Sequence, residues 1–154
     1  GFWFGDPAPG YEPPPALRAF LADGPPPVAI GFSSQVVRDG ARLARAVADG
    51  VAQAGVRAVV LGGYGALTGV ASSASLCPVP SVPYEWLFPR VAAVVHHGGS
   101  GSTGEALRAG VPNMAVPFGY DQPLWGARRA ARGVGPAPVP ATALTAERLA
   151  AALR

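Results

Sequence analysis

The segment 92–123, with the sequence AAVVHHGGSGSTGEALRAGVPNMAVPFGYDQP, restricts the fold more than any other part of the chain. An apolar run at 91–95 predicts a buried strand, and a Gly/Ser-rich turn over 96–103 follows it. Helix-forming residues at 104–109 come next, and a second apolar run occupies 114–118. A strand, a glycine-rich loop, a helix and a strand in this order direct the N-terminus of the helix at an anion.

The chemistry of this loop suits a phosphate group. Free backbone N–H groups and the helix dipole attract negative charge, and glycine lets a ligand approach the backbone closely. The hydroxyls of Ser100, Ser102 and Thr103 add hydrogen-bond donors. All 12 basic residues of the chain are Arg, and the absence of Lys excludes a lysine Schiff base and a Walker A phosphate loop.

Short apolar runs alternate with helical patterns along the rest of the chain. Strands are predicted at 28–32 and 57–61, with a proline-broken edge strand within 76–82 and a short strand at 136–139. Helices are predicted at 16–23, 38–54, 124–132 and, after an N-cap at Thr145, 146–153, with one helical turn at 84–88. Continuous apolar strands indicate a parallel sheet covered on both faces. The predicted fold class is therefore α/β, a Rossmann-like doubly wound domain.

Three turns with small or polar residues follow predicted strands, at 33–34, 96–103 and 119–122. Ligands of doubly wound sheets bind beyond the carboxyl ends of the strands. We therefore expect these turns to converge on one crevice.

Length and composition limit the other possibilities. The 154 residues, of which 49% are hydrophobic, suit one domain, placed at 16–154 after a proline-rich linker segment at 1–15. No apolar run approaches the ~20 residues of a membrane span. The first residue is Gly and no basic segment follows it, so we expect no signal peptide, a chain that begins after processing or as a cut fragment, and a cytoplasmic location.

The charge pattern and the cysteine count exclude further classes. The net charge is only +3 and the arginines are scattered, so we expect no nucleic-acid partner. Cys77 is the one cysteine, which excludes an internal disulfide and a cysteine metal cluster and leaves a buried thiol as its expected state.

Two adjacent histidines end the strand at 91–95. His97 either donates to a phosphate oxygen or holds the turn through backbone hydrogen bonds, and we favour the first interpretation. For His96 we favour a structural role, because adjacent residues of a strand point to opposite faces. No third ligand lies at a suitable spacing, so we expect no metal site.

Polar residues near the two later helices have two interpretations each. Glu105 complements the helix dipole or accepts hydrogen bonds from ribose hydroxyls. Asp121 and Gln122 bind adjacent sugar hydroxyls, or Asp121 caps the helix that follows it, and the residues alone favour the cap. Trp86 and Trp125 are expected in the core rather than at a ligand. Residue chemistry alone thus reaches a domain that binds phosphate and, as we infer, a nucleotide sugar.

The stretch HHGGSGSTGEALRAGVP, followed by PFGYDQPLWGAR, resembles the inverting nucleotide-sugar glycosyltransferases of family 1. It is most similar to bacterial relatives of sterol glucosyltransferases and of antibiotic-modifying enzymes, which typically have HHGGAGTT, then RAGVP, then PFxxDQ. VAIGFSS resembles the first strand and the GFGS turn of that family, and GFWFGDP resembles the linker that enters its C-terminal domain. The likeness covers nearly the whole chain in the right order.

The resemblance implies one half of a GT-B fold, in which two Rossmann-like domains enclose the active site. This chain resembles the donor-binding domain, and the N-terminal acceptor domain with the general base is absent. The implied reaction moves a hexose from a UDP- or dTDP-sugar, with inversion, to a hydroxyl of a lipophilic or natural-product acceptor, and the isolated chain would be inactive. No cofactor and no metal ion are expected.

The resemblance also implies residue roles. His97 would stabilise the leaving diphosphate, Glu105 would hold the ribose, and Asp121 with Gln122 would bind the transferred sugar. Ser81 and Val82 would pack against the base, and the remaining residues would hold the diphosphate. The implied donor-binding residues are Ser34, Ser81, Val82, His97, Gly99, Gly101, Ser102, Thr103, Glu105, Asp121 and Gln122.

The sequence departs from the family pattern at several positions. Ser33 replaces the usual glycine of GFGS, and Ser102 replaces the usual threonine. Many sterol-type members lack an acid at the position of Glu105, and 78–83 contains no counterpart of the tryptophan that stacks on the base in the plant branch. The choice between uridine and deoxythymidine therefore stays open.

Two other hypotheses remain at this stage. One is a stand-alone nucleotide-sugar binding module, or one subunit of a two-chain transferase. The other is a structural Rossmann domain with a degenerate site, which predicts no affinity for nucleotides.

Overall fold

The computed structural model describes residues 4, 10–35, 37, 39–63 and 65–154. Residues 1–3 and 5–9 of the predicted linker lie outside the described residues.

Five strands form one parallel sheet in the order β3-β2-β1-β4-β5. The strands are β1 Val28–Gly31, β2 Ala58–Leu61, β3 Leu76–Val79, β4 Ala93–His96 and β5 Asn113–Ala115. The strand order runs outward in both directions from β1 and β4, as doubly wound sheets do, so the predicted fold class is confirmed. As predicted, the proline-broken strand β3 lies at an edge of the sheet.

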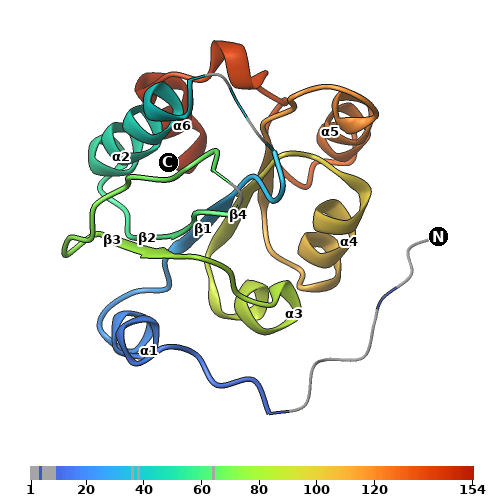
Figure 1. The fold of residues 1–154 in the computed structure, drawn as a ribbon. Coiled ribbons are helices and arrows are strands. Elements are labelled where there is room, and N and C mark those ends of the chain that lie inside the picture. Colours follow the sequence, from blue (N-terminus) through green and yellow to red (C-terminus); the bar gives the residue numbers. More distant parts are fainter. Residues whose placement is uncertain (1–3, 5–9, 36, 38, 64) are drawn as a thin grey trace.

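Helices cover both faces of this sheet (Figure 1). They are α1 Pro15–Ala22, α2 Gly40–Ala54, α3 Tyr84–Leu87, α4 Ser100–Arg108, α5 Gln122–Ala130 and α6 Ala146–Leu153, with short 3-10 turns η1 Phe88–Arg90 and η2 Ala141–Ala143. Thr145 caps α6 as predicted, because its side chain accepts a hydrogen bond from the backbone N–H of Arg148 at 3.3 Å.

Alternate residues of the strands build two apolar cores, one on each face. On the first face, Ile30 and Val95 pack in the core that α2 and α6 cover. On the second face, Ala29 and Val94 pack in the core that includes residues of α1, α3 and α4. The sheet is therefore buried on both sides, as its continuous apolar strands predict.

Helices α2 and α6 lie side by side over the first core (Figure 1). Gly50 of α2 faces Leu149 of α6, and a Cβ at Gly50 would lie 2.9 Å from Cδ2 of Leu149. Glycine at this point therefore lets α6 approach α2 closely. Leu149 is completely buried.

Several element boundaries differ from the prediction, and two elements differ most. Helix α4 begins at Ser100, before the predicted start at 104, because burial of Ser102 and Thr103 outweighs the low helix propensity of the Gly/Ser run. The predicted strand at 136–139 does not form. Val139 N–H donates to the Ala115 carbonyl at 3.1 Å, but alternate residues of this stretch are prolines without an N–H, so no ladder develops beside β5.

The carboxyl ends of β1 and β4 are neighbours, since Gly31 pairs with His96. This is the point at which the strand order reverses direction. In the turn after β1, Ser33 adopts a left-handed backbone conformation with φ 53°. Gly63 follows β2 with φ 56° and packs so closely on the Ser33 carbonyl that a Cβ there would collide with it. The two turns therefore hold each other in place at this edge.

In the described residues, no helix has the length and apolar character needed to cross a membrane.

Leu149→Ala is expected to lower the free energy of unfolding by about 2–5 kcal/mol, because it opens a cavity between α6 and α2. Leu107→Ala on α4 is the matched control, since Leu107 is 41% exposed, and its effect should stay below about 1 kcal/mol. Urea unfolding followed by circular dichroism measures both values. Equal losses in the two variants would contradict this account of the core.

Candidate functional site

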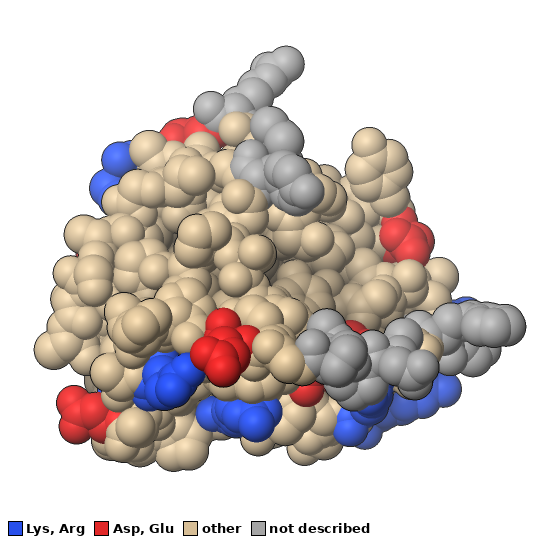
Figure 2. Space-filling view, turned by 60° about the horizontal axis from the view of Figure 1, so that its bottom comes forward, with Lys and Arg blue, Asp and Glu red and all other residues tan. Residues whose placement is uncertain are grey.

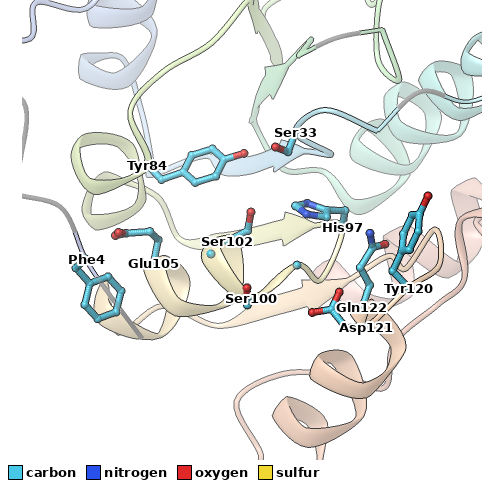
Figure 3. Close-up of a pocket in the computed structure, with 12 residues that line it drawn as sticks. Phe4, Ser33, Tyr84, His97, Ser100, Ser102, Glu105, Tyr120, Asp121 and Gln122 are labelled. Carbon is cyan, nitrogen blue, oxygen red and sulfur yellow. The ribbon is translucent and has the colours of Figure 1, made fainter. Parts of the chain in front are cut away.

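A cavity of about 510 Å³, here called the central cavity, opens at the carboxyl edge of the sheet (Figure 3). The three turns predicted to converge all contribute to it. The residues that line it are Phe4, Ser33, Tyr84, His97, Gly99, Ser100, Gly101, Ser102, Glu105, Tyr120, Asp121 and Gln122. In Figure 3 Glu105 and Phe4 lie at one end, Tyr120, Asp121 and His97 lie toward the other, and Ser102 lies between them.

The N-terminus of α4 forms the floor of the central cavity. Gly99 occupies the N-cap position with extended backbone, and no side chain caps the helix. The N–H groups of a first helical turn lack intrahelical partners, and the helix dipole adds partial positive charge there. The hydroxyls of Ser100 and Ser102 flank the same turn. This end of α4 therefore has the geometry of an anion site.

His97 lies against the glycines before α4. A Cβ on Gly99 would collide with Nε2 of His97, so only glycine leaves room for the ring. Nδ1 of His97 is buried and has no hydrogen-bond partner in the described part of the chain. Burial lowers the pKa of His97, and the nearby Asp121 carboxylate opposes that shift. At neutral pH the imidazole is thus uncharged, and its N–H is a neutral donor.

His96 has the structural role expected for it. Its ring is buried, with its centroid 6.5 Å from that of His97 and the two ring planes at 89°. Its Nδ1 accepts a hydrogen bond from the N–H of Gly98 at 3.1 Å, so Nε2 carries the proton and donates to Oδ1 of Asn113 at 3.1 Å. The ring therefore fixes the turn that carries His97.

Asp121 and Gln122 are oriented by hydrogen bonds of their own. Oε1 of Gln122 accepts from the backbone N–H of Phe118 at 2.7 Å, which leaves its NH₂ group as a donor. Asp121 precedes α5, but its side chain caps no backbone group. Its Oδ2 instead accepts from the indole N–H of Trp125 at 2.8 Å. Asp121 therefore occupies the predicted N-cap position, but its side chain does not cap the helix. Trp125 is half-buried rather than in the core.

A second cavity of about 300 Å³, here called the apolar cavity, adjoins the central one. Ser81 and Val82 line it together with Leu61 and Pro80. The two cavities share Ser33, Tyr84 and Glu105, so they form one continuous crevice.

Glu105 and Tyr84 stand where the two cavities join. The Glu105 carboxylate pairs with Arg108 one turn further along α4, with 3.7 Å between Oε1 and Nη1. Tyr84 stacks on Phe88 with ring centroids 4.6 Å apart, and its hydroxyl points toward Ser33 (Figure 3). Tyr84 was not predicted as a site residue, because its sequence context indicates only a helical turn.

Two predicted residues lie outside the crevice lining. Ser34 lines a third cavity of about 980 Å³, on the far side of Tyr120 and Phe118, while its neighbour Ser33 lines the central cavity. Thr103 lies in the first turn of α4, but its hydroxyl is buried and has no hydrogen-bond partner among the described residues.

The charged side chains that line the crevice are carboxylates, those of Glu85, Glu105 and Asp121. Among the described residues, no Lys or Arg lines the central or the apolar cavity. Figure 2 shows a face on which side chains of both signs are interspersed along the lower part and most of the surface is uncharged. The described residues contain no cluster of three or more His, Cys, Asp or Glu side chains that could hold a metal ion. The groups of this lining that can attract an anion are therefore neutral donors and dipoles.

Sequence comparison relates the chain to glycosyltransferases. The family profile of erythromycin biosynthesis protein CIII-like C-terminal domains matches residues 69–154, more than half of the chain. O-mycaminosyltylonolide 6-deoxyallosyltransferase of Streptomyces fradiae is 46% identical over 157 aligned positions, which cover 100% of this chain and 36% of that protein. A sterol 3-beta-glucosyltransferase of Arabidopsis thaliana is 40% identical over 141 residues, 91% of this chain and 22% of that protein.

Solved structures share the fold. Glycosyltransferase VinC in complex with dTDP has a TM-score of 0.67 and 28% identity, and the match covers 88% of this chain and 34% of that one. Os79 of O. sativa, in complex with UDP and a glucoside, has a TM-score of 0.76 and 21% identity over 94% of this chain and 36% of that one. The chain thus spans about a third or less of the length of these relatives.

The buried His96 makes stability depend on pH. Burial lowers its pKa from 6.5 to about 4 in the folded chain. Between these values the unfolded chain binds more protons, so the free energy of unfolding falls as the pH drops from 6.5 to 4 and then levels off. This loss amounts to roughly 3 kcal/mol. An NMR titration of the two imidazole signals, assigned with His97→Ala, measures the pKa of His96 in the folded chain. A midpoint near 6.5 for His96 would contradict this pH dependence.

Proposed function

The chain belongs to the family of erythromycin biosynthesis protein CIII-like C-terminal domains, and on this premise we propose that it binds the nucleotide-sugar donor of a glycosyltransferase. The observation that carries the proposal is the continuous crevice. It has an apolar end, a carboxylate at its middle, a helix N-terminus with His97, and a polar pair at its other end. A nucleotide sugar has matching groups in the same order: an apolar base, a ribose with hydroxyls, an anionic diphosphate and a polar sugar.

The diphosphate would lie over the N-terminus of α4. The N–H groups of its first turn, the Ser102 hydroxyl and the His97 imidazole would donate to its oxygens, with Gly99 and Gly101 leaving room for close approach. Ser34 and Thr103 belong to this part of the proposal through the resemblance. Among the described residues, the buried Nδ1 of His97, which lines the central cavity, has unused hydrogen-bonding capacity.

These donors would also assist the reaction. When an acceptor hydroxyl displaces the diphosphate from the anomeric carbon with inversion, negative charge grows on the leaving phosphate. Donors already fixed around it stabilise that charge, and one such donor is typically worth about 100- to 1,000-fold in rate. The proposal therefore needs neither a metal ion nor another cofactor.

The nucleoside would occupy the other end of the crevice. Ser81 and Val82 would pack against the base in the apolar cavity, and Glu105 would accept hydrogen bonds from ribose hydroxyls. The solved relatives support a pyrimidine nucleoside diphosphate, since one holds UDP and another dTDP. Both nucleotides remain within the proposal.

The transferred hexose would contact Asp121 and Gln122, where one oxygen can accept and one amide can donate. Its acceptor would be a hydroxylated lipophilic or natural-product molecule, because the relatives are named for sterols and for O-mycaminosyltylonolide. The acceptor site and the general base would come from a further domain or a second chain. A stand-alone donor-binding module is the alternative.

His97→Ala is expected to weaken the binding of UDP or dTDP by about 10- to 100-fold, because it removes a hydrogen bond to a charged oxygen. Calorimetric titration of UDP, dTDP, UDP-glucose and dTDP-glucose into the purified chain measures this, with wild-type dissociation constants expected between about 1 μM and 1 mM. Leu107→Ala is the control for a remote change. A folded wild-type chain that binds none of the four ligands would refute donor binding by this chain.

Glu105→Gln is expected to weaken the binding of UDP several-fold and that of dTDP much less. Deoxyribose lacks the 2′-hydroxyl that would donate a hydrogen bond to the second carboxylate oxygen. The substitution also breaks the ion pair with Arg108, so Arg108→Gln is the matched control and should leave the UDP-to-dTDP ratio unchanged. Calorimetry gives both dissociation constants. An equal loss for the two nucleotides in Glu105→Gln would exclude the ribose contact.

A further inference from the structure

Trp125 is the residue that holds the Asp121 side chain. It lies on α5 one turn beyond Asp121, and its indole N–H donates to Oδ2 of the carboxylate at 2.8 Å. Trp125 is half-buried, while Asp121 is exposed at the mouth of the central cavity. The contact therefore joins a partly fixed aromatic ring to a carboxylate that would otherwise rotate freely.

The first turn of α5 offers the carboxylate no other partner. Pro123 has no N–H, and the N–H groups of Gln122 and Leu124 donate to the backbone carbonyls of Gly119 and Asp121. The Asp121 side chain accordingly forms no cap bond. The indole holds Oδ2, so the carboxylate stays at the lining of the central cavity beside Gln122 (Figure 3).

The neighbouring Gln122 is fixed in the same way. The Phe118 N–H occupies its Oε1, so Gln122 offers the cavity only N–H donors. Asp121 has Oδ1 available as an acceptor. The pair thus presents one acceptor and one donor in a fixed arrangement, which suits two hydroxyls that donate and accept at set positions.

We propose that Trp125 is a positioning residue that sets the sugar specificity of this site by holding the Asp121 carboxylate at the lining of the central cavity. The proposal rests on the proposed function, in which Asp121 and Gln122 bind the hexose. Without the indole N–H, the exposed carboxylate would rotate among several side-chain conformations, and the preference for one hydroxyl arrangement would weaken. Trp125 itself would touch no sugar atom.

The test uses Trp125→Phe, which keeps an aromatic ring and removes the N–H. Calorimetry on the purified chain compares UDP, UDP-glucose and its C4 epimer UDP-galactose, or the thymidine series if that binds more tightly. We expect affinity for the preferred nucleotide sugar to fall about 3- to 10-fold, and affinity for the nucleoside diphosphate to stay within about 2-fold. The difference in affinity between UDP-glucose and UDP-galactose should become smaller.

Two further variants make the result specific. Trp86→Phe is the matched control, because Trp86 packs edge-on against Tyr11 and lines neither cavity, so the substitution should change no affinity. Asp121→Asn tests the premise that Asp121 binds the hexose. It should weaken the binding of the nucleotide sugar without affecting the binding of the nucleoside diphosphate.

The outcomes separate the two proposals. If Asp121→Asn weakens the nucleotide sugar and Trp125→Phe does not, the positioning role is refuted and the proposed function stands. If Trp125→Phe weakens the binding of the nucleoside diphosphate as much as that of the nucleotide sugar, the substitution disturbs the structure generally. The positioning role is then also refuted. If the wild type binds the sugar form no more tightly than the diphosphate, the Asp121–Gln122 assignment fails, and the inference fails with it.

Discussion

The buried imidazole of His96 is the interaction on which the site depends. It receives the Gly98 N–H at one nitrogen and donates to Asn113 of β5 at the other, so it ties the end of β4 to both its neighbouring strand and the following turn. That turn sets the position of His97 and the start of α4. Because the ring is buried, its neutral form is strongly favoured, and the two hydrogen bonds keep one fixed direction.

The crevice combines rigid elements with small residues. Three turns meet at the carboxyl edge because the sheet is parallel, and glycine occupies the positions where a Cβ would strike a neighbour, as at Gly63 and Gly99. Polar side chains in the lining are held from behind, Gln122 by Phe118 and Asp121 by Trp125. Because these side chains are already oriented, less conformational entropy is lost when a ligand binds.

Sequence patterns predicted the sheet, the main helices and the convergence of the turns, because burial on both faces leaves clear apolar runs. They failed where tertiary contacts decide. The Gly/Ser run became the first turn of α4 because Ser102 and Thr103 are buried, which no local propensity encodes. The bond from Trp125 to Asp121 depends on one rotamer pair, and the contribution of Tyr84 to both cavities depends on where α3 meets the sheet edge.

The lack of Lys and Arg among the described lining residues has a consequence for the conditions under which an anion would bind. Attraction between full charges is screened by dissolved salt over about 8–10 Å. Backbone dipoles, hydroxyls and a neutral imidazole act mainly at hydrogen-bond range, while the carboxylates of Glu105 and Asp121 in the same lining would repel an anion at longer range. Binding at the α4 N-terminus should therefore not weaken steeply as the ionic strength rises, and close geometric fit rather than long-range steering would select the ligand.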